Sequence, residues 1–403
     1  MDRPFYIKQI VSFVDKGVVK VFTGIRRCGK SRIMGMVRDV LLSRGVAVGQ
    51  IVEANFESKK TDFVKTADRA FAHVKTCSES AGGKRLYLLL DEIQELDGWE
   101  KLVNAIMVDF DVDIYLTGSN AKLLSGELST YLGGRYVEIH VFPLSFGEVV
   151  EWGRMENPGA SARELFRRYV REGGMPFLQD AKIGGDSAMA YLSDVFGSVV
   201  VKDIAKRHKI RDIDLLERFL SYLVSEAGHT FSASSVKKYL KHENRDISLE
   251  TIYNYLRYAE EACLTLPLKR MDLVGKRILS SQEKIYLADP GFREALFGTN
   301  EASIDQILEN IVAVDLVRRG FDVTVGLVGA KEVDFVAERG GEKIYVQVSY
   351  LMPTAEIRDR EFSVLERIPD NYPKFVLSMD EMDFSRNGIL HRPIADFLLD
   401  SAF

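Results

Sequence analysis

The stretch from Gly24 to Ser31 has the residue types and spacing of a loop that binds phosphate groups. It fits the pattern G-x-x-x-x-G-K-[ST], in which backbone N–H groups surround phosphate oxygens. The apolar run 18–22 before it predicts a strand, and residues 31–42 predict a helix whose positive end favours anions. We expect Lys30 to reach the β and γ phosphates and the Ser31 hydroxyl to ligate Mg²⁺. The residues predicted to contact a nucleoside triphosphate are Gly24, Arg27, Cys28, Gly29, Lys30, Ser31 and Arg32.

Two acidic residues follow a second strand-like run and could complete a catalytic site. Residues 86–90 are continuously apolar, which is typical of a strand buried on both faces of a parallel sheet. Ligands of open α/β sheets bind at the carboxyl ends of the strands. We therefore expect Asp91 to hold the Mg²⁺ shell and Glu92 to orient and deprotonate an attacking water. A purely structural role remains the alternative, because acidic residues also cap strand ends and begin helices.

Two further polar residues follow strand-like runs. Asn120 comes shortly after the predicted strand 113–117 and could hydrogen-bond the γ-phosphate or the water, although Ser and Asn also favour helix N-caps. Arg135 follows a glycine pair and precedes the strand-like run 136–143. Such an arginine can lie against the γ-phosphate of its own chain or of a neighbouring subunit. A solvated or structurally paired arginine is the alternative.

Composition indicates a soluble multidomain protein. A length of 403 residues suits two or three domains, and the shares of 46% apolar and 28% charged residues are ordinary for globular chains. No apolar run approaches the ~18 residues of a membrane-spanning helix, so we expect no membrane association. The first residues lack a signal-peptide pattern, and three scattered cysteines indicate neither a disulfide framework nor a metal site. We therefore expect a cytoplasmic location.

Taken in order, these motifs resemble those of a family of prokaryotic AAA-type (AAA_14) P-loop ATPases that carry a DUF4143 C-terminal region. The resemblance spans nearly the whole chain, and its landmarks lie at residues 24–31, 90–95, 117–120, 133–135, 143–146 and 173–176. It implies an additional-strand ATPase core followed by a helical lid, with ATP as the nucleotide. It also implies that Gly174 and Pro176 lie near that nucleotide. A plain helix break is the alternative for these two residues.

The middle of the chain has the outline of a winged helix-turn-helix. Three segments with helical spacing, 215–223, 232–240 and 248–260, precede two strand-like pieces at 264–268 and 284–287. Residues 202–284 hold 16 Lys and Arg against 12 Asp and Glu, whereas the whole chain has a net charge of −5. Basic residues there could contact the phosphates of duplex DNA without choosing a sequence. The candidates are Lys237, Lys238, Lys241, Arg257 and Arg270. The open alternative is that the winged helix packs against the core or a partner protein.

The C-terminal region resembles the restriction-endonuclease-like, PD-(D/E)xK, fold. Glu309 lies on a predicted helix, and alternation puts Asp334 on the same strand face as Glu332. The nuclease family would place Glu at 347 and Lys at 349, where this chain has Gln347 and Ser349. Gln lacks the charge that holds a divalent ion, and Ser supplies no cation beside the scissile phosphate. We therefore expect a binding or docking module, and an active nuclease, with Asp334 and Glu309 holding a metal weakly, is the remote alternative.

The sequence thus predicts an α/β protein with four parts. They are a P-loop, AAA-like core with a parallel sheet at 1–155, a helical lid at 156–212, a winged helix at 213–295 and a degenerate nuclease-like domain at 296–403. We expect an ATPase that acts as a nucleotide-driven conformational switch. Two alternatives for its use stay open: a DNA-associated ATPase, and a signalling or assembly switch with a protein partner. The sequence also leaves open a homo-oligomer.

Overall fold

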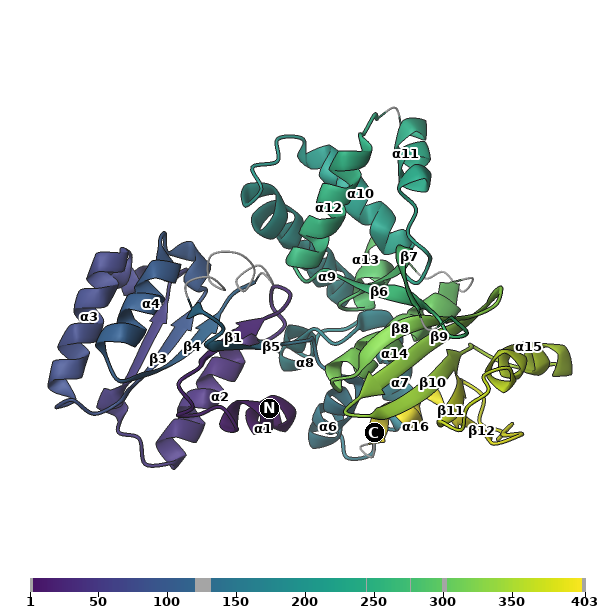
Figure 1. Cartoon of the computed structure of the whole chain (residues 1–403), viewed down its shortest axis with the longest axis horizontal. Coiled ribbons are helices and arrows are strands. Elements are labelled where there is room, and N and C mark those ends of the chain that lie inside the picture. The colour runs from purple at the N-terminus through teal and green to yellow at the C-terminus, as the bar shows by residue number, and fades with distance from the viewer. Residues whose placement is uncertain (1–2, 120–131, 244, 276, 299–302, 401–403) are drawn as a thin grey trace. The chain divides into compact units, whose positions relative to one another are not determined.

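The chain forms two compact units in a computed structural model (Figure 1). The structure describes residues 3–119, 132–243, 245–275, 277–298 and 303–400, with the backbone alone at residues 62, 63, 277 and 279–282. Residues 1–142 with 261–263 make up the N-terminal unit, and residues 143–260 with 264–403 make up the C-terminal unit. The predicted division into four parts is finer than this, and its boundaries stay predictions.

The N-terminal unit is built on a parallel five-stranded sheet with the strand order β2-β3-β4-β1-β5. Its strands are β1 (Val19–Thr23), β2 (Ile51–Asn55), β3 (Leu86–Asp91), β4 (Val112–Thr117) and β5 (Tyr136–His140). Its described helices are α1 (Pro4–Val11), α2 (Lys30–Ser43), α3 (Ala67–Ser80) and α4 (Trp99–Asp109). Short 3-10 turns lie at η1 (Val48–Gln50), η2 (Lys59–Val64) and η3 (Ile93–Glu95). The predicted parallel α/β core is confirmed.

Every residue of β1 and β3 is buried, because both sheet faces are covered, and the first five residues of β3 are accordingly apolar. Alternate residues such as Val21 and Leu88 join a core with α3 and α4, while α2 contacts β3 and β4 from the other face. The carboxyl ends of parallel strands meet at one sheet edge, because all strands run the same way. The phosphate loop after β1, the acidic pair after β3 and the end of β4 therefore lie side by side.

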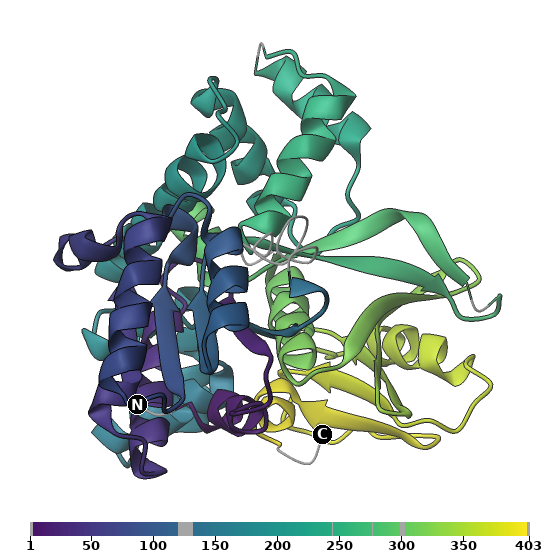
Figure 2. The same ribbon diagram turned by 60° about the vertical axis from the view of Figure 1, so that its left-hand side comes forward.

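The C-terminal unit is built on a seven-stranded mixed sheet with the strand order β12-β11-β10-β9-β8-β6-β7 (Figures 1 and 2). Its strands are β6 (Thr265–Asp272), β7 (Arg277–Leu287), β8 (Asp322–Val328), β9 (Lys331–Arg339), β10 (Glu342–Val348), β11 (Lys374–Ser378) and β12 (Ile389–Pro393). Its first described helices are α6 (Phe146–Glu156), α7 (Ala162–Glu172), α8 (Pro176–Asp180), α9 (Asp186–Ser198) and the π-helix η5 (Val199–Lys206). The later ones are α10 (Ile213–Ser225), α11 (Ala233–His242), α12 (Leu249–Glu261), α13 (Gly291–Phe297), α14 (Ile304–Arg318), α15 (Ala355–Glu366) and α16 (Ile394–Leu399).

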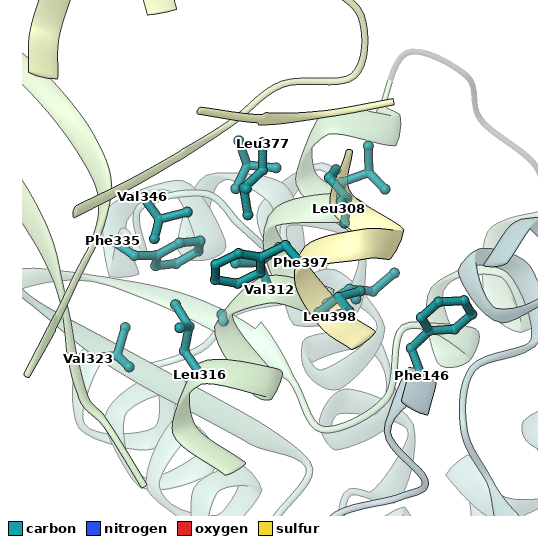
Figure 3. Close-up of a cluster of buried hydrophobic side chains, with 14 of the residues drawn as sticks. Phe146, Leu308, Val312, Leu316, Val323, Phe335, Val346, Leu377, Phe397 and Leu398 are labelled. Carbon is teal, nitrogen blue, oxygen red and sulfur yellow. The ribbon is translucent and has the colours of Figure 1, made fainter. Parts of the chain in front are cut away.

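Helices cover both faces of this sheet. Figure 3 shows Phe335 and Val346 of the sheet beside Val312 of α14 and Phe397 of α16 within one buried apolar cluster. Residues of the opposite parity, such as Val336, pack with α15 instead, as the alternation of a pleated strand requires. The nuclease-like region is therefore a folded α/β layer structure with its own core.

The predicted three helices and hairpin of the middle region are present as α10, α11, α12, β6 and β7. The hairpin, however, continues the seven-stranded sheet, because β6 pairs in parallel with β8. Leu268 and Tyr286 of the hairpin are buried in the same apolar cluster as α14, which explains this continuation. The winged-helix interpretation itself stays a prediction. No helix in the described ranges is long and apolar enough to cross a bilayer.

Candidate active site

The phosphate loop is shaped by three residues with positive φ angles. Gly24, Arg27 and Gly29 have φ of 144°, 65° and 105°, a region that favours glycine and is uncommon for other residues. A Cβ atom at Gly24 would lie 2.2 Å from the carbonyl oxygen of Val141, so the first glycine of the motif is required by close approach. The loop therefore turns sharply into α2, as the motif predicts.

The amino end of α2 and Lys30 give the loop its positive character. Gly29 is the N-cap, and no side chain among the described residues caps the helix. The first intrahelical bond runs from the Ile33 N–H to the Gly29 carbonyl at 3.1 Å, so the first turn of α2 presents N–H groups without an intrahelical partner to an anion. Lys30 Nζ donates to the carbonyls of Gly24 and Ile25 at 2.9 and 3.1 Å. This arrangement suits a polyphosphate.

Arg3 braces the loop from the N-terminus, a role that sequence reasoning missed. Its buried guanidinium donates to the carbonyl oxygens of Cys28 at 3.3 Å and Phe142 at 3.0 Å. It also lies over the ring of Tyr6, whose hydroxyl accepts the Phe142 N–H at 3.0 Å. No local motif could reveal these contacts, because they join residues 25 to 139 positions apart.

Cys28 contributes to the loop through its backbone. Its thiol is fully buried, and burial raises the pKa of this thiol despite the nearby charges of Lys30 and Arg3. A buried thiol with a raised pKa is a poor nucleophile. The nucleotide contact at this position stays a prediction, and the buried thiol would leave it to the peptide group.

Asp91 and Glu92 end β3 beside the loop, and neighbouring strands hold them in place. The Thr117 hydroxyl donates to Asp91 Oδ1, and Asn55 Nδ2 donates to Asp91 Oδ2 at 2.8 Å. The N–H of Glu92 in turn donates to Thr117 Oγ1 at 2.9 Å. Glu92 has φ of 52° and ψ of 47°, a left-handed conformation that turns the chain away from the sheet at this point. Thr117 and Asn55 were not predicted as site residues.

The environment of Glu92 alters its proton affinity. Burial raises the pKa of the Glu92 carboxyl, while the charge of Lys30 and a hydrogen bond from Gln94 oppose that shift. The same lysine acts on His140 of β5, whose pKa is lowered to about 4 by burial and by the Lys30 charge. A glutamate with a raised pKa is closer to the range that suits a general base.

A cleft of about 320 Å³ opens beside α2 at this edge of the sheet. It is lined by Ser31, Met34, Gly35, Arg38, Glu53, Ala54, Asn55, Leu89 and Asp91. The oxygen-bearing side chains of Ser31, Asn55 and Asp91 thus border one space, and oxygen is the ligand that Mg²⁺ prefers. Within the described ranges, no group of three or more His, Cys, Asp or Glu could hold a metal by itself.

Arg135 lies at the other end of the sheet from the loop. Its carbonyl accepts the N–H of Val19 at 3.0 Å, at the start of β1, whereas the phosphate loop follows the end of that strand. Its guanidinium donates to Asn104 at 3.4 Å and to the Leu132 carbonyl at 3.2 Å. The structure therefore does not bring Arg135 to the phosphate loop of its own chain. Asn120 lies outside the described residues.

Gly174 and Pro176 have structural reasons for their identity within the C-terminal unit. A Cβ atom at Gly174 would lie 2.0 Å from the Leu144 carbonyl oxygen, and the Gly174 N–H donates to Asp289 Oδ2 at 2.7 Å. Pro176 occupies the first turn of α8, where a missing N–H costs nothing. Their contact with a nucleotide stays a prediction.

The residues predicted to contact DNA differ in how exposed they are and in whether they form ion pairs. Lys237, Lys238 and Lys241 are exposed on α11, and no ion pair involves them in the part of the chain that the structure describes. Arg257 is exposed on α12 and donates to Asn254 at 3.1 Å. Arg270 instead is half-buried and forms an ion pair with Glu332, so a phosphate would have to compete with that carboxylate.

Lys284 occupies the middle of the nuclease-like acidic cluster, and sequence reasoning missed it. Its ammonium group lies 3.1 Å from Glu309 Oε2 and 2.5 Å from Glu332 Oε1. Burial would lower the pKa of Lys284, but the carboxylates of Glu309, Asp334 and Glu332 outweigh burial and raise it. Lys284 is a residue of β7, so the positive charge beside these carboxylates is that of a protein side chain.

Gln347 is fitted to its surroundings as an amide. Its Oε1 accepts the Asp334 N–H at 3.3 Å, and its Nε2 donates to Glu361 Oε2 at 3.1 Å. A glutamate here would face a second carboxylate with no proton between them. Gln347, which departs from the nuclease motif, is therefore held by hydrogen bonds within this domain.

Family models match most of the chain in two pieces. Residues 16–150 match AAA_14, an AAA domain, and residues 163–303 match DUF8612, a domain of unknown function. These matches do not confirm the DUF4143 region that the resemblance implied. An uncharacterized protein of Haemophilus influenzae is 36% identical over 380 residues, which cover 94% of this chain and 93% of that protein. The uncharacterized protein MJ1544 of Methanocaldococcus jannaschii is 29% identical over 364 residues, 87% of this chain and 78% of that protein.

Similar solved structures are distant. The Walker-type ATPase PABY2304 of Pyrococcus abyssi has a TM-score of 0.49 and 16% identity, covering 73% of this chain and 95% of that one. The Aeropyrum pernix ORC1 protein, solved in complex with DNA, has a TM-score of 0.33 and 13% identity. The match covers 73% of this chain and 91% of that one. Likenesses at this level do not indicate function. On these sequence matches, the chain carries an AAA domain with a phosphate loop and belongs to the same family as the Haemophilus influenzae protein.

Proposed function

We propose that this protein is a Mg²⁺-dependent ATPase that hydrolyses ATP at the carboxyl edge of the N-terminal sheet. One observation carries the proposal: Asp91 and Glu92 end a strand beside the phosphate loop, and the Lys30 charge acts on the Glu92 carboxyl. An acid that only capped a strand would not need a left-handed backbone at Glu92, a conformation that carries strain and clusters at functional sites.

Each part of this edge has a role in the proposed reaction. The loop N–H groups and Lys30 bind the triphosphate, and Ser31 with Asp91 would hold Mg²⁺. Bound Mg²⁺ neutralises charge on the phosphate oxygens. Glu92 orients the attacking water and takes its proton.

Replacing Glu92 by Gln tests the catalytic assignment. Glu92→Gln is expected to lower phosphate release by about 10²–10⁴-fold while a fluorescent ATP analogue still binds. Glu95→Gln, a change at an exposed position three residues away, is the matched control and should hydrolyse as wild type does. Equal turnover by wild type and Glu92→Gln would show that the base is assigned incorrectly. Omitting Mg²⁺ should stop turnover of the wild type.

We further propose that Arg135 acts on a nucleotide held by a neighbouring copy in a homo-oligomer. Its place at the sheet end opposite its own loop supports a role in trans. Arg135→Ala and Glu92→Gln proteins should each be inactive alone and partly active when mixed, because a mixed interface can combine an intact Glu92 of one copy with an intact Arg135 of the other. A mixture without activity would count against this arrangement.

The proposed use of hydrolysis is a conformational switch, and DNA is the partner that one observation favours. Lys237, Lys238 and Lys241 present exposed charge on α11 that no described acid neutralises. A triple change of these lysines to Glu should abolish duplex binding measured by anisotropy, and wild-type affinity should fall by ~10³-fold or more between about 50 and 200 mM salt if six or more phosphates are contacted. Changing the exposed Lys59 and Lys60 to Glu is the control. Absence of DNA binding at low salt would favour a protein partner.

We assign no nuclease activity to the C-terminal unit. Lys284 lies between the carboxylates that would have to hold a metal, and Ser349 supplies no cation. DNA incubated with the protein and either Mg²⁺ or Mn²⁺ is expected to remain uncut. Cleavage that persisted after Asp334→Asn would point to a contaminating enzyme, and cleavage lost with it would contradict this assignment.

A further inference from the structure

We propose that Thr117 is the residue that positions Asp91 and Glu92 for hydrolysis. The inference rests on the proposed ATPase function and extends it to a residue of another strand. Thr117 is the last residue of β4, and its side chain is fully buried. It is a positioning residue, since its side-chain hydrogen bonds are with the two acids.

The Thr117 hydroxyl is shared between two successive residues of β3. It donates its single proton to Asp91 Oδ1 and accepts the N–H of Glu92 at 2.9 Å. A hydroxyl has one donor and two acceptor sites, so both bonds can exist at once. One side chain thus fixes the carboxylate orientation of one acid and the backbone orientation of the next.

The bond to the Glu92 N–H matters because of the conformation at that residue. With φ of 52° and ψ of 47°, the backbone of Glu92 lies in a region that non-glycine residues seldom occupy. Such conformations persist when the surrounding structure determines them. The Thr117 oxygen accepts the hydrogen bond from the Glu92 N–H in this turn. Without that acceptor the Glu92 backbone would no longer be held in this conformation, and the Glu92 side chain would lose its fixed direction.

Asn55 also contacts Asp91, and a comparison with it shows what is particular to Thr117. Asn55 pairs with Asp91 in the sheet register, and its Nδ2 donates to Asp91 Oδ2 at 2.8 Å. Asp91 is therefore held from both sides, by β2 and by β4. Only Thr117, among these two, also contacts Glu92. Loss of Asn55 should disturb one acid, whereas loss of the Thr117 hydroxyl should disturb both.

The test replaces Thr117 by Val, which keeps the shape and removes the hydroxyl, and by Ser, which keeps the hydroxyl and removes a methyl group. Thr117→Val is expected to lower kcat about 10²-fold, the scale of a small misplacement of catalytic groups. Its KM and its affinity for an ATP analogue should stay near the wild-type values, because the phosphate loop is unchanged. The Mg²⁺ concentration for half-maximal turnover should rise, since Asp91 loses a donor. Thr117→Ser should recover most of the turnover.

Each result separates this inference from the proposed function. A wild type that hydrolyses ATP together with a folded Thr117→Val of equal kcat would overturn the inference alone. A wild type without Mg²⁺-dependent hydrolysis would overturn the proposed function instead. If Thr117→Val fails to give a cooperative melting transition, Thr117→Ala removes the same hydroxyl with less steric demand. If both hydroxyl-free variants fail to fold while Thr117→Ser is fully active, the role is structural and the inference is wrong.

Discussion

Lys284 places its ammonium group 3.1 Å from the Glu309 carboxylate, in the interior of a domain whose layout resembles a nuclease. The ammonium and the carboxylate are both largely buried, and Glu332 contacts the same lysine from β9. A nuclease of this layout would direct its acids at a divalent ion. Here the acids surround a side chain of the same domain, and the cluster joins β7, β9 and α14.

Replacing Lys284 by Met should destabilise the protein by about 3–5 kcal/mol, because removal of one partner leaves buried carboxylates uncompensated. Urea unfolding at neutral pH measures the change. The deficit should shrink at acidic pH, where the buried Glu309, whose pKa is raised by burial, becomes protonated in the variant. Lys238→Met, at an exposed position, is the control and should leave the unfolding midpoint almost unchanged.

Gln347→Glu should also destabilise the protein, although it restores the residue type of a nuclease motif. The new carboxylate would face Glu361, which now accepts a hydrogen bond from the Gln347 amide at 3.1 Å. Loss of that donor costs about 1–3 kcal/mol. The melting temperature should fall at neutral pH and recover partly at acidic pH. An unchanged melting temperature would mean that this region rearranges more easily than its burial suggests. The exposed Gln9→Glu serves as a control for the added charge.

The pH dependence of turnover should report on Glu92. Burial raises the pKa of this carboxyl, and a general base must be ionised, so kcat/KM should fall as the pH drops through a value above the ~4.3 of an ordinary glutamate. The hydrogen bond from Gln94 favours the ionised form. Gln94→Leu should therefore move the acidic limb of the profile to still higher pH. If the acidic limb does not move in this variant, the limb does not report the protonation of Glu92.

Gly174→Ala tests the close approach of two chain segments in the C-terminal unit. The added Cβ would lie 2.0 Å from the Leu144 carbonyl oxygen, and both segments are backbone that cannot move aside cheaply. A loss of about 1–3 kcal/mol is expected in chemical unfolding. Gly197→Ala is the matched control, because a Cβ there meets open space within α9, and alanine should stabilise the helix by up to about 1 kcal/mol.

Asp289 should make stability fall with rising pH over a defined range. Burial raises the pKa of Asp289 to about 6, although the N–H groups of Gly174 and Gly291 oppose this shift. The folded protein therefore holds this proton more tightly than the unfolded chain does. Between about pH 4 and pH 6 the carboxyl contributes up to ~3 kcal/mol that is lost as the pH rises. The unfolding free energy of wild type minus that of Asp289→Asn should decline across this range and be flat above it.

The sequence predicted those parts of the molecule that local patterns specify. The strand before the phosphate loop and the helix after it were placed within a residue or two of β1 and α2, because a motif with required glycines leaves little freedom. Asp91 and Glu92 were placed at the end of a buried strand for the same reason. By contrast β2 was not singled out, because its charged Glu53 and half-buried ends weaken the pattern of an apolar run.

Contacts between residues that lie far apart in the sequence could not be predicted from it, for a physical reason. Arg3, Asn55, Thr117 and Lys284 act through partners that are 25 or more residues away, and periodicity specifies a face but not a partner. The position of Arg135 shows the same limit, since its nearness to a strand in sequence did not reveal at which end of the sheet it lies. Strand order and direction decide such relations, and both emerge only from the folded sheet.

The pairing of β6 with β8 also determines how the chain can be divided. A cut near residue 296, the boundary that the sequence predicted, would remove β6 and β7 and leave the backbone groups of β8 unpaired along one edge. Exposed edge strands recruit other chains and promote aggregation. A soluble C-terminal fragment therefore has to begin upstream of Thr265, so that the hairpin stays with the sheet that it protects.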